Sequence, residues 1–246
     1  MTKYKILCTR ELEPSLIEQA IQNNIDIDVI PFIETEPIDS LEVYNEVENA
    51  LQQTTTVVFT SMNAVNAVAV HLHKYKPVWK IYCIGNTTKK LIEKYFGNDS
   101  IVATAKDATE LAEKIVEDDG IDEVIFFCGD KRRDELPALL NQHEIEVHEI
   151  EVYRTKLIRH NINKSYDGIL FFSPSAVISF FRYNTVYGKT ILFAIGNTTA
   201  NEIKKYSGNM IVTSEEAGKK NLVESAIIFF DKDRIDIDND HSQFTK

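Results

Sequence analysis

Short apolar runs alternate with amphipathic segments along most of the chain. The apolar runs are rich in β-branched and aromatic residues, a composition typical of buried strands. The regularity of the alternation indicates a repeated strand–helix pattern. We predict strands at Lys5–Thr9, Ile25–Ile30, Thr56–Thr60, Lys80–Ile84, Ser100–Thr104, Glu123–Cys128, Ile145–Ile150, Gly168–Phe172, Thr190–Ile195 and Met210–Thr213.

The segments between these runs have helical periodicity. Leu12, Leu16 and Ala20 recur at the spacing of one helix face, and residues 108–116 repeat this pattern. Strands that alternate with helices form right-handed βαβ units, whose parallel sheets are covered on both faces. We therefore predict an α/β protein with flavodoxin-like parallel sheets, in which ligands bind at the carboxyl ends of the strands.

The sequence also contains an internal repeat. The motif IGNTT occurs at Ile84–Thr88 and at Ile195–Thr199, which are 195 − 84 = 111 residues apart. FTSMNAV at Phe59–Val65 is similar to FFSPSAV at Phe171–Val177, with 171 − 59 = 112. The repeat indicates that the chain contains two copies of one α/β domain.

A second pair of similar segments sets the order of the copies. NIDIDVIPF at 24–32 is similar to EIEVHEIEV at 144–152, with an offset of 144 − 24 = 120. An extra predicted helix at 39–53, with no counterpart after Tyr153, absorbs the difference between the offsets. The repeated pieces therefore follow one another as 1–33, 38–118, 121–152 and 165–230.

The first piece, with two strands and a helix, is too small to close a core alone. Pro31–Pro37 and Glu151–Ile158 occupy matching positions, and both are predicted to be extended. Two such crossings favour two domains joined by a two-stranded linker, while tandem domains with a single linker are the alternative. We predict a discontinuous first domain of 1–33 plus 158–232, an inserted second domain at 38–150, and a disordered acidic tail at 233–246.

The charge and cysteine content limit the class of protein. The formal net charge of −11 makes binding to nucleic acid or to a membrane surface unexpected. The start of the sequence lacks the apolar core of a secretory signal, and no apolar run approaches the ~20 residues that span a bilayer. Cys8, Cys83 and Cys128 lie in separate apolar runs and are expected to be buried free thiols. We expect a monomer located in the cytoplasm.

Motifs for common cofactors are absent from the sequence. None of the nine glycines are spaced as G-x-G, and no phosphate-binding G-x-x-x-x-G-K-[ST] loop occurs. No G-x-S-x-G motif surrounds Ser61 or Ser173, which argues against an α/β-hydrolase. We therefore predict a site with no cofactor and no metal.

Small polar residues occupy the turns where predicted strands lead into helices. Hydroxyl groups, free N–H groups and the positive end of the helix dipole favour an anion at such turns. The alternative is that Ser, Thr and Asn are there only as helix caps, and that the cations belong to solvated helix starts. If the sheets faced each other, these turns would form a pocket for a ligand with many carboxylates or phosphates. The candidate anion-binding residues from these turns are Thr9, Arg10, Gly85, Gly129, Lys131, Arg132 and Gly196.

Six phrases of the sequence, taken together, carry a family resemblance. In order, they are VVFTSMNAV, IYCIGNTTKKLI, FFCGDKRRDELPALL, EVYRT, DGILFFSPSAVISFF and ILFAIGNTTANEI. The ordered set resembles the uroporphyrinogen-III synthase family from about Lys3 to Phe230. The resemblance implies two α/β domains joined by a two-stranded ladder, with the N-terminal piece completing the C-terminal domain.

The resemblance also implies an activity. It indicates a cofactor-free lyase of haem biosynthesis, which closes linear hydroxymethylbilane to uroporphyrinogen III with loss of water and inversion of the last ring. A transient contact with the upstream deaminase is a further expectation.

Site residues can be carried over from the family at the matching motif positions. Tyr153, in the V-Y-x-T segment, is implied as the general acid, and Thr88 is implied to lie beside the site. For Tyr153, the alternative is an aromatic side chain that packs against a domain edge. The substrate-binding residues implied by the resemblance are Ser61, Asn63, Ser173, Ser175 and Thr199.

Two other functions are compatible with the same residues. The first is a non-catalytic, two-lobed protein that binds a polyanionic small molecule. The second is a scaffold whose polar turns serve only as helix caps. The isomer of uroporphyrinogen that forms from hydroxymethylbilane, together with any thermal shift of the protein, distinguishes all three.

Overall fold

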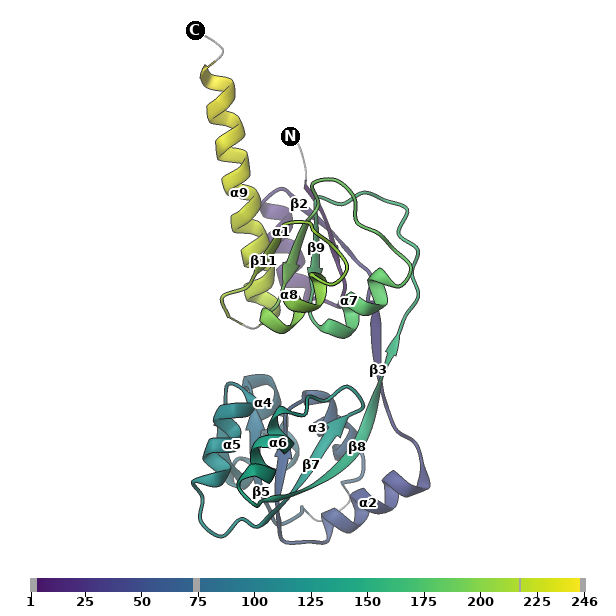
Figure 1. The fold of residues 1–246 in the computed structure, drawn as a ribbon, viewed down its shortest axis with the longest axis vertical. Helices are drawn as coiled ribbons and strands as arrows, with labels where there is room; N and C mark the ends of the chain where they lie inside the picture. Colours follow the sequence, from purple (N-terminus) through teal and green to yellow (C-terminus); the bar gives the residue numbers. More distant parts are fainter. Residues whose placement is uncertain (1–3, 73–75, 217, 244–246) are drawn as a thin grey trace. The chain divides into compact units, whose positions relative to one another are not determined.

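The computed structural model describes residues 4–72, 76–216 and 218–243, with side chains described as far as Asp231. The chain divides into two compact units, which we call unit 1 (Met1–Glu34 with Lys156–Lys246) and unit 2 (Thr35–Thr155). Each unit is an α/β domain with its own sheet (Figure 1), so the predicted fold class is confirmed. The chain passes between the units twice, within β3 (Ile33–Pro37) and within β8 (Glu146–Leu157).

Unit 1 contains a five-stranded sheet in the order β11-β10-β9-β1-β2. All neighbouring strands in it are parallel, as the βαβ pattern predicts. The elements are β1 (Tyr4–Cys8), α1 (Pro14–Gln22), β2 (Ile25–Val29), β9 (Gly168–Phe171), α7 (Pro174–Phe181), β10 (Ile191–Ala194), α8 (Asn197–Ile203), β11 (Ile211–Thr213) and α9 (Lys219–Gln243).

Both faces of the unit 1 sheet are buried under helices. Side chains of successive strand residues point to opposite faces, so Cys8 packs with Leu16 of α1 and Leu222 of α9. Its neighbour Leu7 packs with Val177 of α7 on the other face. This explains why the strands read as continuous apolar runs rather than as an alternation of apolar and polar residues.

Unit 2 contains a six-stranded sheet in the order β3-β8-β7-β4-β5-β6. Pairs within β8-β7-β4-β5-β6 are parallel. The further elements are α2 (Leu41–Leu51), β4 (Thr55–Phe59), α3 (Met62–Ala69), β5 (Trp79–Ile84), α4 (Asn86–Tyr95), η1 (Asn98–Ser100), β6 (Ile101–Ala105), α5 (Ala108–Val116), β7 (Glu123–Gly129) and α6 (Glu135–Gln142). Helix α2 is the extra helix that the repeat offsets predicted.

Strands β3 and β8 form the predicted two-stranded linker. The backbone N–H of Ile38 donates to the carbonyl of Val152, and the N–H of Ile158 donates to the carbonyl of Phe32. As residue numbers fall from 38 to 32 along one strand, they rise from 152 to 158 along the other. The two segments therefore run in opposite directions, whereas the strands within each repeated sheet are parallel.

The two sheets share an order but not a register. Leu170 and Val58 are equivalent in the sequence repeat, since 170 − 58 = 112. Leu170 pairs with Cys8 in unit 1, but Val58 pairs with Phe126 in unit 2, although the repeat makes Cys128 the counterpart of Cys8. Strand β7 is thus displaced by two residues along its neighbour, and it continues as far as Gly129.

Helix α9 extends into 233–246, the segment predicted to be a disordered acidic tail, and that disorder stays a prediction. The backbone of α9 is helical as far as Gln243, and residues 244–246 lie outside the described part of the chain. Residues 231–243 contain neither Gly nor Pro, so nothing in the sequence interrupts a helix that has already begun.

The three cysteines are free and buried, as predicted. Burial is the main cause that raises the pKa of each thiol. Each thiol therefore behaves as a small apolar side chain of the core rather than as a nucleophile.

Candidate active site

The candidate site of unit 2 centres on Tyr153, near the carboxyl end of β7. Strand β8 places Tyr153 beside Gly129, its partner across the ladder, next to an irregularity in the register after Cys128. The phenol O–H of Tyr153 donates to the hydroxyl oxygen of Ser61 at 3.2 Å. This distance is longer than the ~2.7–2.8 Å of a typical O–H···O bond, so the phenol proton can also turn to another acceptor.

Ser61 connects this phenol to a helix start. Its backbone is extended, and its hydroxyl oxygen accepts the backbone N–H of Asn63 at 3.1 Å, as an N-cap of α3 does. The same oxygen thus accepts two hydrogen bonds, from Asn63 and from Tyr153. The predicted capping role of Ser61 is present, together with a contact to Tyr153 that the sequence did not indicate.

The phenol of Tyr153 is held in its neutral form. Burial raises its pKa, and the hydrogen bond with Ser61 opposes that effect in part. Because the ordinary pKa of tyrosine is already ~10, the group carries its proton at neutral pH. Tyr153 can therefore donate a proton or a hydrogen bond.

A pocket of about 240 Å³ lies beside the Tyr153 ring. Asn63 and Asn66 of α3 form one wall, and residues 35–37 of β3 form another. The sequence predicted Asn63 but not Asn66 or the wall from β3. The spacing Asn-x-x-Asn, which places both amides on one helix face, was a usable signal for Asn66. The remaining residues that line the pocket are Ala67 and Val70.

Thr88 and Gly85 occupy the next turn of the same sheet. Thr88 is the third residue of α4 and is buried, with 5% of its surface exposed. It does not line the pocket beside Tyr153, because α4 follows β5 and only β4 leads into the helix that does. Gly85 precedes α4 with a φ of +80°, a left-handed conformation that favours glycine.

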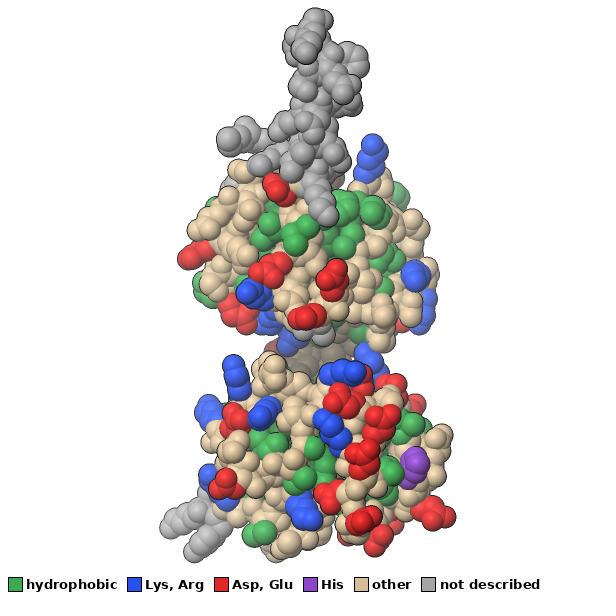
Figure 2. All heavy atoms as spheres, turned by 90° about the vertical axis from the view of Figure 1, so that its left-hand side faces the viewer, with side chains coloured by type: hydrophobic (Ala, Val, Ile, Leu, Met, Phe, Trp, Pro, Cys, Tyr) green, Lys and Arg blue, Asp and Glu red, His purple; other side chains and the backbone are tan. Residues whose placement is uncertain are grey.

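The predicted cations after β7, Arg132 and Lys131, differ in how free they are to bind an anionic ligand. The guanidinium of Arg132 is paired with the carboxylates of Glu149 and Asp134, which offset its charge. Lys131 is exposed and lies 3.5 Å from a carboxylate oxygen of Asp130. Figure 2 shows Lys and Arg side chains along one margin of unit 2. Exposed cations that follow β5, β6 and β7 include Lys90, Lys106, Lys131 and Arg133.

In unit 1, two of the predicted site residues have structural roles. Thr9 is fully buried, and its hydroxyl donates to the carbonyl of Leu170 at 2.7 Å, so this hydroxyl is occupied within the fold. Ser173 caps α7 by accepting the N–H of Ala176 at 3.2 Å. The helix-cap alternative therefore describes Ser173, and Thr9 serves to join two strands.

The remaining predicted residues of unit 1 lie at its other strand ends. Thr199 is the buried third residue of α8 and occupies the position of Thr88 in the repeat. Gly196 precedes that helix in an extended conformation with a φ of 178°, which any residue can adopt. Arg10 and Ser175 are half-buried, after β1 and at the start of α7.

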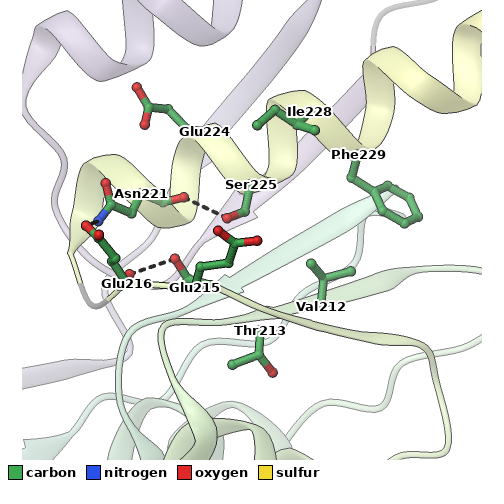
Figure 3. Close-up of a pocket in the computed structure, with 10 residues that line it drawn as sticks. Val212, Thr213, Glu215, Glu216, Asn221, Glu224, Ser225, Ile228 and Phe229 are labelled. Atoms are coloured by element: carbon green, nitrogen blue, oxygen red, sulfur yellow. Dashed lines mark hydrogen bonds between the residues drawn. The ribbon is translucent and has the colours of Figure 1, made fainter.

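A larger pocket of unit 1, about 430 Å³, lies between the end of β11 and α9. Glu215, Glu216 and Glu224 line this pocket together with the apolar Ile228 and Phe229, and Glu216 lies near Asn221, away from Phe229 (Figure 3). Three carboxylates make the potential here negative, which repels a ligand rich in carboxylates. This pocket is thus unsuited to the predicted anion.

The described residues contain neither a cluster of metal-ligating side chains nor a membrane-spanning helix. Within residues 4–72, 76–216 and 218–243, no three His, Cys, Asp or Glu side chains gather as metal ligands would. In the same part of the chain, no helix has both the length and the apolar character required to traverse a bilayer.

Comparisons with known proteins place the chain in a family. The family model described as uroporphyrinogen-III synthase HemD matches residues 15–224. A mutant uroporphyrinogen III synthase from the extremely thermophilic bacterium Thermus thermophilus is similar in structure, with a TM-score of 0.62, 13% identity, and coverage of 92% of this chain and 97% of that one. Uroporphyrinogen-III synthetase from Helicobacter pylori has a TM-score of 0.62, 16% identity, and coverage of 92% and 99%. No curated protein matches the sequence.

The solved structures, at these identities, establish similarity of fold. The family model goes further because it spans most of the chain, from residue 15 to residue 224. It confirms the resemblance carried by the six phrases of the sequence. The chain belongs to the uroporphyrinogen-III synthase family.

Proposed function

We propose that this chain closes hydroxymethylbilane to uroporphyrinogen III with loss of water, as a lyase that needs no cofactor. Membership of the uroporphyrinogen-III synthase family is the observation that carries the proposal. The neutral phenol of Tyr153 beside a pocket with two amides supports it, because the reaction requires a proton donor and hydrogen bonds that orient the substrate.

The chemistry begins at the hydroxymethyl group of the substrate. The lone pair of the adjacent pyrrole nitrogen expels the hydroxyl, the carbon–oxygen bond breaks, and an electrophilic azafulvenium cation remains, which keeps its N–H proton. In our proposal, Tyr153 gives its proton to the departing oxygen, so that water leaves rather than hydroxide. The substituted α-carbon of the last pyrrole attacks this cation, and the bond from that carbon to its original methylene bridge then breaks. The released bridge carbon, now the electrophile, bonds to the free α-carbon of the same ring, which inverts the ring. That carbon loses its proton to the phenolate, and the pyrrole recovers its aromaticity.

The pocket beside Tyr153 is too small for the whole tetrapyrrole. Its volume of about 240 Å³ is below the ~300–1,000 Å³ of pockets that enclose drug-sized ligands. We propose that it receives the pyrrole that carries the hydroxymethyl group, with Asn63 and Asn66 donating hydrogen bonds to the acetate or propionate arm. The other carboxylates would lie toward the exposed cations that follow β5 to β7.

The deciding experiment is to identify the product isomer. The protein is incubated with hydroxymethylbilane, and the uroporphyrin isomers are separated by chromatography after oxidation. Isomer III in excess over a protein-free control supports the proposal, because unassisted closure gives isomer I. Isomer I alone with a ligand-induced rise in Tm indicates a binding protein instead, and isomer I without such a rise indicates a scaffold.

Replacement of Tyr153 by Phe tests the acid role. We expect Tyr153→Phe to lower kcat by about 10²-fold or more, with little change in KM, because general acid catalysis contributes ~10²–10⁴. The wild-type kcat is expected to persist to about pH 10, since the pKa of the phenol is raised and the acid is lost only above it. Tyr187→Phe, at a tyrosine that is 80% exposed, is the matched control. A wild-type kcat for Tyr153→Phe would remove Tyr153 as the acid.

A further inference from the structure

The ring of Tyr153 lies directly against Gly129. A Cβ atom placed on Gly129 would come within 3.0 Å of three ring atoms of Tyr153, namely Cζ, Cε1 and Cε2. These three atoms form the half of the ring that carries the hydroxyl. The missing side chain at position 129 therefore sets how closely the phenol approaches the end of β7.

The backbone gives no other reason for glycine at this position. Gly129 is not among the glycines with positive φ, unlike Gly85 with its φ of +80°. An alanine could adopt the same backbone conformation without strain. The ring of Tyr153 is thus the neighbour that position 129 accommodates.

Ser61 binds the hydroxyl group at the tip of the same side chain. Its hydroxyl oxygen is held at the start of α3 by the N–H of Asn63, so it is a stationary acceptor for the phenol. Gly129 limits the ring on one side, and Ser61 holds the hydroxyl. The two contacts come from β7 and α3, which both pack in the same core as Tyr153.

We infer that Gly129 and Ser61 are positioning residues for Tyr153, which together hold its hydroxyl at the pocket lined by Asn63 and Asn66. The inference rests on the proposed function, in which Tyr153 is the proton donor. Gly129 and Ser61 thereby act on the reaction through Tyr153, in place of the substrate-binding role predicted for both from the sequence.

Position 129 can be tested without disrupting the fold. The atoms that an alanine side chain would meet belong to the far end of the Tyr153 side chain, which can rotate away, and not to the backbone. Gly129→Ala should therefore move the ring and leave the sheet intact. Gly208→Ala is the matched control, because Gly208 is exposed and a Cβ there would meet nothing within 4 Å.

Turnover is the first measurement. We expect Gly129→Ala to lower kcat by about 10²-fold with KM unchanged, the loss that follows when a reacting group is displaced by ~1 Å. Gly208→Ala should keep the wild-type kcat. If Tyr153→Phe slows the enzyme and Gly129→Ala does not, the inference is overturned while the proposed function stands.

The ionisation of Tyr153 is the second measurement, and it needs no substrate. It is followed by NMR of ¹³C-labelled tyrosine, with Tyr153→Phe to assign the signal. Gly129→Ala should lower the phenol pKa because the displaced ring is less buried. Ser61→Ala should raise it because the Ser61 hydroxyl, which can donate a hydrogen bond to the phenolate, is lost. An unchanged pKa in both variants would overturn the inference, even in a protein that proved to have no synthase activity.

Thermal unfolding provides the third measurement. Gly129→Ala should lower Tm by about 2–4 °C or more because of the conflict with the ring, and by much less in a Tyr153→Ala background. If Gly129→Ala alone does not fold, recovery of folding in the double variant supports the contact. If Gly129→Ala lowered Tm equally in the wild-type and Tyr153→Ala backgrounds, contact with the Tyr153 ring would not be the reason for glycine at position 129.

Discussion

The two units share one sheet order and differ at the carboxyl ends of their strands. In unit 1, Thr9 follows β1, and its buried hydroxyl donates to the carbonyl of Leu170 on the neighbouring strand. This hydroxyl is therefore not available to a ligand. In unit 2, β7 continues to Gly129, and the ring of Tyr153 covers that glycine and reaches Ser61. One copy of the repeat thus uses a buried hydroxyl to join strands, and the other leaves room for a phenol beside a pocket.

This difference shows how a duplicated fold can hold a site in one copy. The fold determines where the strands end. The side chains at those ends determine whether the space beside them is occupied by the protein itself or available to a ligand. The irregularity in the β7–β8 register after Cys128 is part of the difference, because it makes Tyr153 the partner of Gly129. Sequence identity between the copies, as in the two IGNTT motifs, therefore does not mean equal roles.

The largest expected effect concerns the independence of the two cores. Phe59 and Phe171 are equivalent in the repeat and fully buried, so we expect either change to Ala to cost about 3–5 kcal/mol in its own unit. Trp79, the only tryptophan, lies in the unit 2 core, and its fluorescence during urea unfolding reports on that unit.

Phe59→Ala should shift the tryptophan transition, while Phe171→Ala should shift only the far-UV circular dichroism. Equal shifts of the tryptophan signal in both variants would mean that the two units unfold together, which would contradict the independence of their cores.

A smaller effect is expected at the glycines of the IGNTT motifs. Gly85 has a φ of +80°, so Gly85→Ala should destabilise the protein by about 1–2 kcal/mol. Gly196 is extended, and a Cβ there would meet nothing within 4 Å, so Gly196→Ala should change stability by no more than ~0.5 kcal/mol. Chemical denaturation measures both, and similar losses would contradict the difference between the two turns.

The smallest expected effect is at Thr9. Thr9→Val keeps the shape and removes the hydroxyl, so we expect a loss of about 1 kcal/mol in the free energy of unfolding and no change in KM. Thr9→Ser, which retains the hydroxyl, is the control. If Thr9→Val raised KM and left stability unchanged, Thr9 would have to be counted as a substrate-binding residue after all.

The strands, the repeat and the linker could be predicted from the sequence because each depends on local pattern. Buried strands of a parallel sheet read as apolar runs, and a duplicated sequence repeats its motifs at a fixed offset. The position of Tyr153 on a crossing strand followed from the same offsets. Its bond to Ser61 did not, because the two residues are 92 positions apart and meet only through the sheet.

The ion-pair partners of the charged residues also could not be predicted from the sequence. Arg132 was expected to bind substrate carboxylates, but Glu149 of the adjacent strand lies beside it and takes that role within the fold. The wall from β3 was missed for a similar reason, since only the antiparallel pairing of β3 with β8 brings it to Tyr153. Such pairings are decided by tertiary neighbours rather than by local pattern.

The double crossing of the chain has a consequence for synthesis on the ribosome. Strand β1 lies between β2 and β9 in its sheet, and β9 begins only at Gly168, after the whole of unit 2 has been translated. Domains that emerge complete fold as units while translation continues. Unit 2 can therefore fold first. Strands β1 and β2, although synthesised earlier, cannot complete the sheet of unit 1 until β9 has been translated.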